Sequence, residues 1–162
     1  MKYIFLLFAI AFCFSSCERR GDWEKIYPQG FSATELSFSA KGGNTTITSQ
    51  RDEWYFFGGI EINGEYFYFP RCGEVFPYVD YSHLKEPKPG ICSDNLLTVK
   101  YDILKKYLEI VEIESAWFKI TKEDPKQMTV FIEPNLTGET RQIGLLAIDR
   151  NGTRISITQL TE

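Results

Sequence analysis

The sequence of 162 residues contains one histidine, His83, and four cysteines that form no C-x-x-C pair. A zinc site built from several histidines is therefore excluded, and a Ser-His-Asp triad would depend on His83 alone. The G-x-S-x-G, P-loop and H-E-x-x-H patterns are also absent. We expect no catalytic residue, no metal and no cofactor.

The chain has no excess of positive charge. It contains 18 basic and 22 acidic side chains, for a formal net charge of −4, and the basic residues form no stripe. A protein that binds nucleic acid usually has a basic face, so we expect no nucleic-acid partner. The hydrophobic content of 43% and the length predict one globular domain.

Only the amino terminus has a long hydrophobic run, from Tyr3 to Phe14. It is shorter than the roughly 20 apolar residues that span a bilayer. Lys2 precedes the run and small residues follow it, which is typical of a secretory signal peptide. We expect residues 1–16 to be this signal.

Residues 14–17, Phe-Ser-Ser-Cys, resemble the lipobox of bacterial lipoproteins, although Phe14 stands where leucine is usual. The resemblance implies that Cys17 is acylated and becomes the first mature residue. Two or more acyl chains give stable membrane anchoring, because each buried CH₂ contributes about 0.8 kcal/mol. We expect a protein of the cell envelope, anchored at the outer membrane, with residues 17–30 as a tether. The alternative is an ordinary signal peptide with a chance cysteine.

The remaining sequence alternates apolar and polar residues in short segments, which is typical of strands. The Asn63-Gly64 and Asn151-Gly152 pairs predict hairpins, since both residue types tolerate positive φ. Polar turns are expected at 122–126 and 135–138, and 102–106 is either a helical turn or a hairpin connection. The predicted strands are 35–40, 45–49, 54–57, 60–62, 65–69, 96–101, 107–113, 116–121, 128–132, 141–148 and 153–159.

Residues 70–95 contain four prolines and are predicted to form a long loop. Cys72 and Cys92 lie near its two ends. Outside the cytoplasm such a pair most often forms a disulfide, and closing a loop of about 20 residues would stabilise the fold by roughly 3 kcal/mol. Free thiols, or a nucleophilic cysteine near His83, are the alternatives.

Two parts of the chain resemble the BACON domain, an immunoglobulin-like β-sandwich module of Bacteroidetes. The resemblance covers about 31–57 and 115–160. The residues that carry it are Leu36, Phe38, Gly42, Gly43, the 45–49 strand, Trp54, Trp117, Asn135, Arg141, Gly144 and Gln159. It implies an all-β immunoglobulin-like sandwich over residues 31–162, with an enlarged hairpin and loop insertion at about 58–115. It also raises glycan binding or a spacer role as possible functions.

Four of these residues are expected to be structural. Trp54 and Trp117 lie in alternating apolar strands, which favours the core over a ligand platform. Arg141 and Gln159 are expected to satisfy backbone groups at strand ends.

The candidate binding residues are tyrosines in and after the 65–69 strand: Tyr66, Tyr68, Tyr78 and Tyr81. Tyrosine offers a flat apolar face and a hydroxyl, which suit sugar rings and protein partners. Alternation places Tyr66 and Tyr68 on one face of their strand, opposite two phenylalanines. The alternative is that these rings pack beneath the long loop. We expect a membrane-anchored, non-catalytic module that binds a glycan or an envelope protein, or else a spacer or assembly subunit without a ligand.

Overall fold

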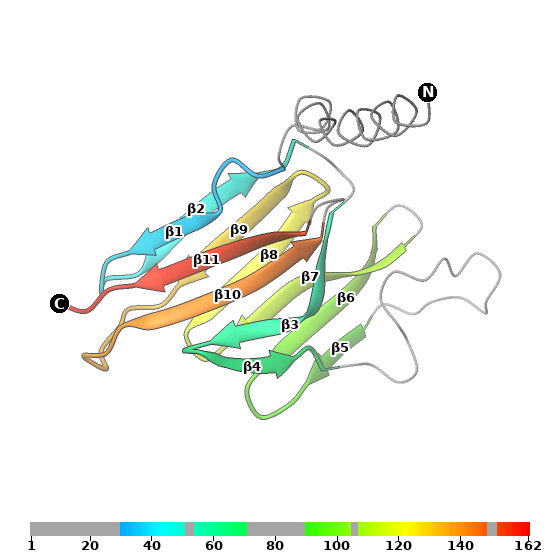
Figure 1. Ribbon diagram of the computed structural model, residues 1–162. Coiled ribbons are helices and arrows are strands. Elements are labelled where there is room, and N and C mark those ends of the chain that lie inside the picture. The colour runs from blue at the N-terminus through cyan, green and yellow to red at the C-terminus, as the bar shows by residue number, and fades with distance from the viewer. Residues whose placement is uncertain (1–29, 51–53, 71–89, 105–106, 149–151) are drawn as a thin grey trace, which may run out of the picture.

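The computed structural model describes residues 30–50, 54–70, 90–104, 107–148 and 152–162. These residues form strands and turns in two sheets packed face to face, an immunoglobulin-like β-sandwich (Figure 1). The predicted all-β fold class is confirmed. Across these ranges, no helix has the length and apolar character needed to cross a membrane.

The first sheet has five strands in the order β1-β11-β10-β3-β4. Its strands are β1 (Glu35–Phe38), β11 (Thr153–Gln159), β10 (Arg141–Ile148), β3 (Tyr55–Ile62) and β4 (Glu65–Tyr68). β1 runs parallel to β11, and the other pairs are antiparallel. The β3–β4 hairpin turns at Asn63 and Gly64, with φ of 50° and 85°. Both values are positive, so the Asn-Gly turn predicted from the sequence is confirmed.

The second sheet has six strands in the order β2-β9-β8-β7-β6-β5, with every pair antiparallel. Its strands are β2 (Gly43–Thr48), β9 (Gln127–Ile132), β8 (Phe118–Asp124), β7 (Tyr107–Ser115), β6 (Thr98–Leu104) and β5 (Gly90–Ser93). Figure 1 draws β1 and β2 at one side of the sandwich and β4 and β5 at the opposite side.

Two local predictions were wrong, and one open alternative is decided. The predicted loop 70–95 contains β5, whose residues pair with β6 despite the nearby prolines. Of the two alternatives for 102–106, the helical turn does not form, because residues 102–104 continue β6 in its antiparallel pairing with β7. The predicted polar turn 122–126 begins three residues later, because β8 continues to Asp124. In each case cross-strand pairing or burial outweighs the local residue preference.

The region expected as an insertion, about 58–115, is shared between the two sheets. β3 and β4 complete one side of the five-stranded sheet. β5, β6 and β7 extend the six-stranded sheet beyond β8. The extension therefore widens the sandwich on the side that carries β4.

The core lies between the sheets and follows the alternation of each strand. β8 buries Phe118, Ile120 and Lys122, and β9 buries Met128, Val130 and Ile132. The five-stranded sheet supplies its inward side chains in the same way. The largest fully buried side chains are those of Trp54, immediately before β3, and Phe56 of β3.

Lys122 is the one charged side chain among the described core residues. Its ammonium donates to the backbone carbonyl of Trp54 at 2.6 Å and to the carboxylate of Glu109. It also lies 4.4 Å from the centroid of the Trp54 ring. The indole N–H of Trp54 donates to the carbonyl of Pro125 at 2.8 Å. The buried charge is thus paired and hydrogen-bonded, as burial requires.

We expect Lys122→Ala to lower the free energy of unfolding by about 3 kcal/mol or more, because it leaves the Glu109 carboxylate and a carbonyl without this donor. Lys119→Ala is the matched control. Lys119 pairs with Glu112 and Glu114 at the surface, where the loss should stay below about 1 kcal/mol. Urea unfolding of both variants measures the difference. Equal losses would contradict the role assigned to Lys122.

Candidate binding surface

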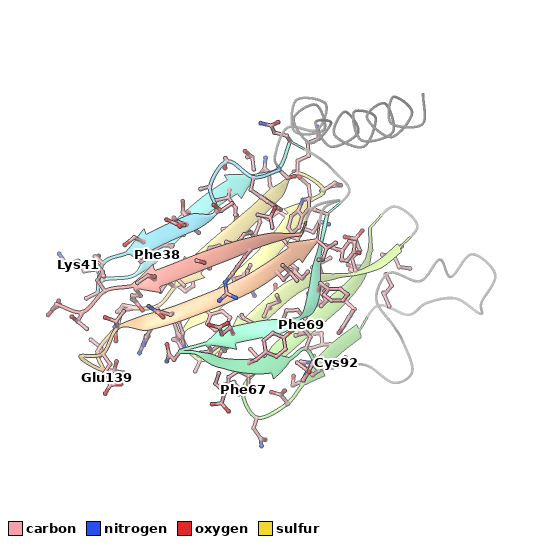
Figure 2. The ribbon with its side chains drawn as sticks, viewed as in Figure 1. Phe38, Lys41, Phe67, Phe69, Cys92 and Glu139 are labelled. Carbon is pink, nitrogen blue, oxygen red and sulfur yellow. The ribbon has the colours of Figure 1, made fainter. Side chains whose placement is uncertain are left out.

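β4 presents two tyrosines on the outer face of the five-stranded sheet. Tyr66 is 51% exposed and Tyr68 is 73% exposed, and their rings meet edge to face with centroids 5.1 Å apart. Phe67 packs against the core and Phe69 is buried. Figure 2 labels these two phenylalanines, together with Cys92 on β5. The alternation expected for this strand is therefore present, with the tyrosines outside.

Two glycines of β3 lie beneath the ring of Tyr66. A Cβ placed on Gly59 would lie 3.0 Å from Cε1 of Tyr66 and 2.1 Å from the carbonyl oxygen of Phe67. A Cβ on Gly58 would lie 2.8 Å from the Tyr66 hydroxyl, and Gly58 has a φ of +72°. The Tyr66 ring therefore lies against the β3 backbone. We call Tyr66, Tyr68, Gly58 and Gly59 the tyrosine platform.

The Tyr66 hydroxyl is protonated at neutral pH. Burial raises its pKa above the usual value of 10.0, and the neighbouring Tyr68 raises it further. A protonated phenol can both donate and accept a hydrogen bond. The platform therefore combines apolar ring faces with polar hydroxyls.

An exposed ion pair lies beside the platform on the same sheet. Arg154 of β11 donates to the carboxylate of Glu61 of β3 at 2.9 Å. Glu61 is the Cα partner of Tyr66 in the β3–β4 register. Arg154 reaches across β10 at Gly144, where a Cβ would lie 2.4 Å from its terminal nitrogen. Sequence reasoning did not find this pair, whose members are 93 residues apart.

Several predicted residues lie outside the described residues: Cys17, Cys72, Tyr78, Tyr81 and His83. The expected acylation of Cys17 and the contribution of Tyr78 and Tyr81 to binding stay predictions. Cys92 lies on β5 and is 8% exposed. Its pairing with Cys72 also stays a prediction.

Trp54, Trp117 and their polar neighbours lie in or against the core. Trp54 is 1% exposed, while Trp117 is half-buried under the Arg141 guanidinium, 5.1 Å from its ring centroid. Arg141 also donates to the side-chain oxygen of Gln159 at 3.4 Å. Gln159 is fully buried, and its amide donates to the Glu133 carbonyl at 2.8 Å. These side chains hold strand ends together.

The carboxylates of Glu112 and Glu114 both lie within ion-pair distance of Lys119, at 2.9 and 3.5 Å. The hydrogen bond to Glu112 is the main reason that the pKa of Lys119 is raised above 10.5. Both carboxylates thus share one ammonium at the surface of the six-stranded sheet. No group of three or more metal-ligating His, Cys, Asp or Glu side chains occurs within the described ranges.

Comparison with known proteins gives one structural likeness. An NMR structure of a protein from Bacteroides thetaiotaomicron matches with a TM-score of 0.49 and 14% sequence identity, over 83% of this chain and 82% of that chain. No protein-family model matches the sequence, and no curated protein matches it.

If the platform is a surface rather than part of the core, Tyr68→Ala should change the free energy of unfolding by less than about 0.5 kcal/mol. Phe69→Ala, one residue along the same chain segment, should lower it by about 3 kcal/mol or more. Thermal or urea unfolding compares the two. A loss for Tyr68→Ala as large as that for Phe69→Ala would show that the tyrosine is a packing residue.

Proposed function

We propose that this protein is a membrane-anchored, non-catalytic binding module of the bacterial cell envelope, with the tyrosine platform as its binding surface. The carrying observation is the exposure of Tyr66 and Tyr68 on an outer sheet face. Exposed aromatic pairs are uncommon on a surface that needs only to be soluble, and tyrosine is enriched at binding hot spots. The ligand is a glycan or an envelope protein.

The shape of the surface supports this proposal. The ring of Tyr66 lies against Gly58 and Gly59, so the β3 backbone fixes its position before a ligand arrives. The partly exposed Phe57 and Leu146 add apolar area on neighbouring positions of β3 and β10. A preformed aromatic surface loses little conformational entropy on binding, which favours affinity.

The point at which the described part of the chain enters the domain also supports the proposal. Gly30 accepts a hydrogen bond from Gln50 at 2.7 Å, and Ser32 donates to Thr48 at 2.8 Å. The chain therefore enters the domain beside β2, whereas β4 is the edge strand at the opposite side (Figure 1). Of the expected tether 17–30, the residues before Gly30 can span at most about 45 Å. With Cys17 acylated, the platform would lie on the side of the domain away from its attachment.

The likeness of parts of the sequence to the BACON module is consistent with a non-catalytic role. In that resemblance Trp117, Arg141 and Gln159 belong to the scaffold, and here they join strand ends. We propose that the chain is a BACON-like module in which β4 supplies the ligand contacts. The predicted disulfide between Cys72 and Cys92 would tie the segment after β4 to β5.

The binding surface is tested by presenting the purified protein to a glycan array and to solubilised envelope proteins. Tyr66→Ala and Tyr68→Ala should each weaken the interaction found with the wild type by tenfold or more, which corresponds to about 1.4 kcal/mol. Phe131→Ala is the control, because Phe131 is a partly exposed aromatic residue on the six-stranded sheet. Unchanged binding by both tyrosine variants would remove the platform from the proposal.

The anchor is tested by metabolic labelling with a clickable fatty acid in a bacterial host. The wild-type protein should carry the label and sediment with membranes, because two or more acyl chains hold a protein on a bilayer. Cys17→Ala should lose both properties, and Cys13→Ala should keep them. Label retained in Cys17→Ala would contradict the lipobox interpretation.

A further inference from the structure

The tyrosine platform continues into a strip of planar side chains across four neighbouring strands. Tyr66 and Tyr68 lie on β4, Glu61 on β3 and Arg154 on β11, with β10 between β3 and β11. Neighbouring strands are about 4.8 Å apart, so the strip spans about 14 Å. This length exceeds a single sugar ring and suits an extended ligand.

Glycines of β3 and β10 leave space for the side chains of the strip to lie close to the sheet backbone. Gly144 is the Cα partner of Glu61, and a Cβ there would meet the terminal nitrogen of Arg154 at 2.4 Å and its Cζ at 2.9 Å. A Cβ on Gly59 would likewise meet the ring of Tyr66, at 3.0 Å from its Cε1. The guanidinium and the ring therefore both lie close to the sheet backbone. A ligand can contact the strip along its length without meeting a protruding side chain at these two positions.

The charges of the strip favour a neutral ligand. The Arg154 side chain is 57% exposed and that of Glu61 is 36% exposed, and their charges offset each other. An anionic ligand would have to compete with Glu61 for the guanidinium, and a cationic ligand would compete with Arg154. A neutral polyol needs no such exchange, since it can accept from guanidinium N–H groups and donate to the carboxylate.

We propose that this strip binds a neutral oligosaccharide, with sugar rings stacked on Tyr66 and Tyr68 and neighbouring hydroxyls held by Glu61 and Arg154. A pyranose ring has an apolar C–H face that fits a tyrosine ring and an equatorial rim of hydroxyls that fits an ion pair. The proposal rests on the binding function proposed above and adds the ligand class and the two polar residues.

Isothermal titration tests the ligand class with defined probes: the neutral pentasaccharides of cellulose, xylan, mannan and starch, the monosaccharide glucose, and pentagalacturonate. At least one neutral pentasaccharide should bind, glucose should bind tenfold or more weakly than it, and pentagalacturonate should bind more weakly than it. Tighter binding of pentagalacturonate, or no binding of any neutral probe, would overturn the proposal.

Variants test the two polar residues with the neutral probe that binds. Glu61→Ala and Arg154→Ala should each reduce affinity by tenfold or more. Glu112→Ala is the control, since it removes a carboxylate from the exposed ion pair on the other sheet. Thermal melting of each variant checks that the fold is kept.

The pattern of losses separates this proposal from the general binding function. If Tyr68→Ala loses affinity while Glu61→Ala and Arg154→Ala keep full affinity, the tyrosine platform stands as the binding surface. The roles proposed for Glu61 and Arg154 are then overturned. Full affinity in both tyrosine variants would instead overturn the binding surface itself.

Discussion

The candidate site depends most on the hydrogen bonds that the buried ammonium of Lys122 donates. The ammonium holds the backbone carbonyl of Trp54, the residue immediately before β3, and it joins that point to Glu109 of β7. Two strands of one sheet are thereby tied to the beginning of a strand in the other. Trp54 in turn contacts Phe31 and Phe56 edge to face, with centroids 5.1 and 5.3 Å apart. β3 thus starts from a fixed position, and it provides the pairing partner and glycine floor for β4.

The other end of the sandwich is held by neutral polar groups. Gln159 and Asn135 are both buried, and their side chains bond backbone groups that no strand ladder satisfies. The Asn135 side chain accepts from Thr137 and donates to the Glu139 carbonyl, which shapes the turn after β9 (Figure 2 labels Glu139). Buried polar side chains therefore connect the two sheets at both ends of the sandwich. Their hydrogen bonds require a defined geometry, whereas apolar packing is not directional.

Much of this fold follows from the sequence because alternation and turn residues are local signals. The β10–β11 and β3–β4 hairpins are predictable from Asn-Gly pairs flanked by apolar residues. Lys122 was missed because a lysine beside Glu, Asp and Pro is typical of a turn, and its burial depends on Trp54 far away in the chain. β5 was missed because prolines precede it and its pairing with β6 is a tertiary property.

The candidate site was predictable only in part, for the same reason. Alternation places Tyr66 and Tyr68 on one face, but it cannot show that this face is the outer one. The glycine floor was visible as the Gly58-Gly59 pair, yet its purpose needs the β3–β4 register. The ion pair of Glu61 and Arg154 forms only when β10 lies between their strands.

The central claim is that the outer face of the five-stranded sheet is the binding surface. The most direct test is a two-dimensional ¹⁵N–¹H NMR titration of the purified protein with the oligosaccharide that it binds. The account predicts shifts clustered at the amides of Gly58, Gly59, Glu61 and Tyr68, with those of Thr121 and Thr129 on the six-stranded sheet unchanged. Shifts confined to the six-stranded sheet would contradict it.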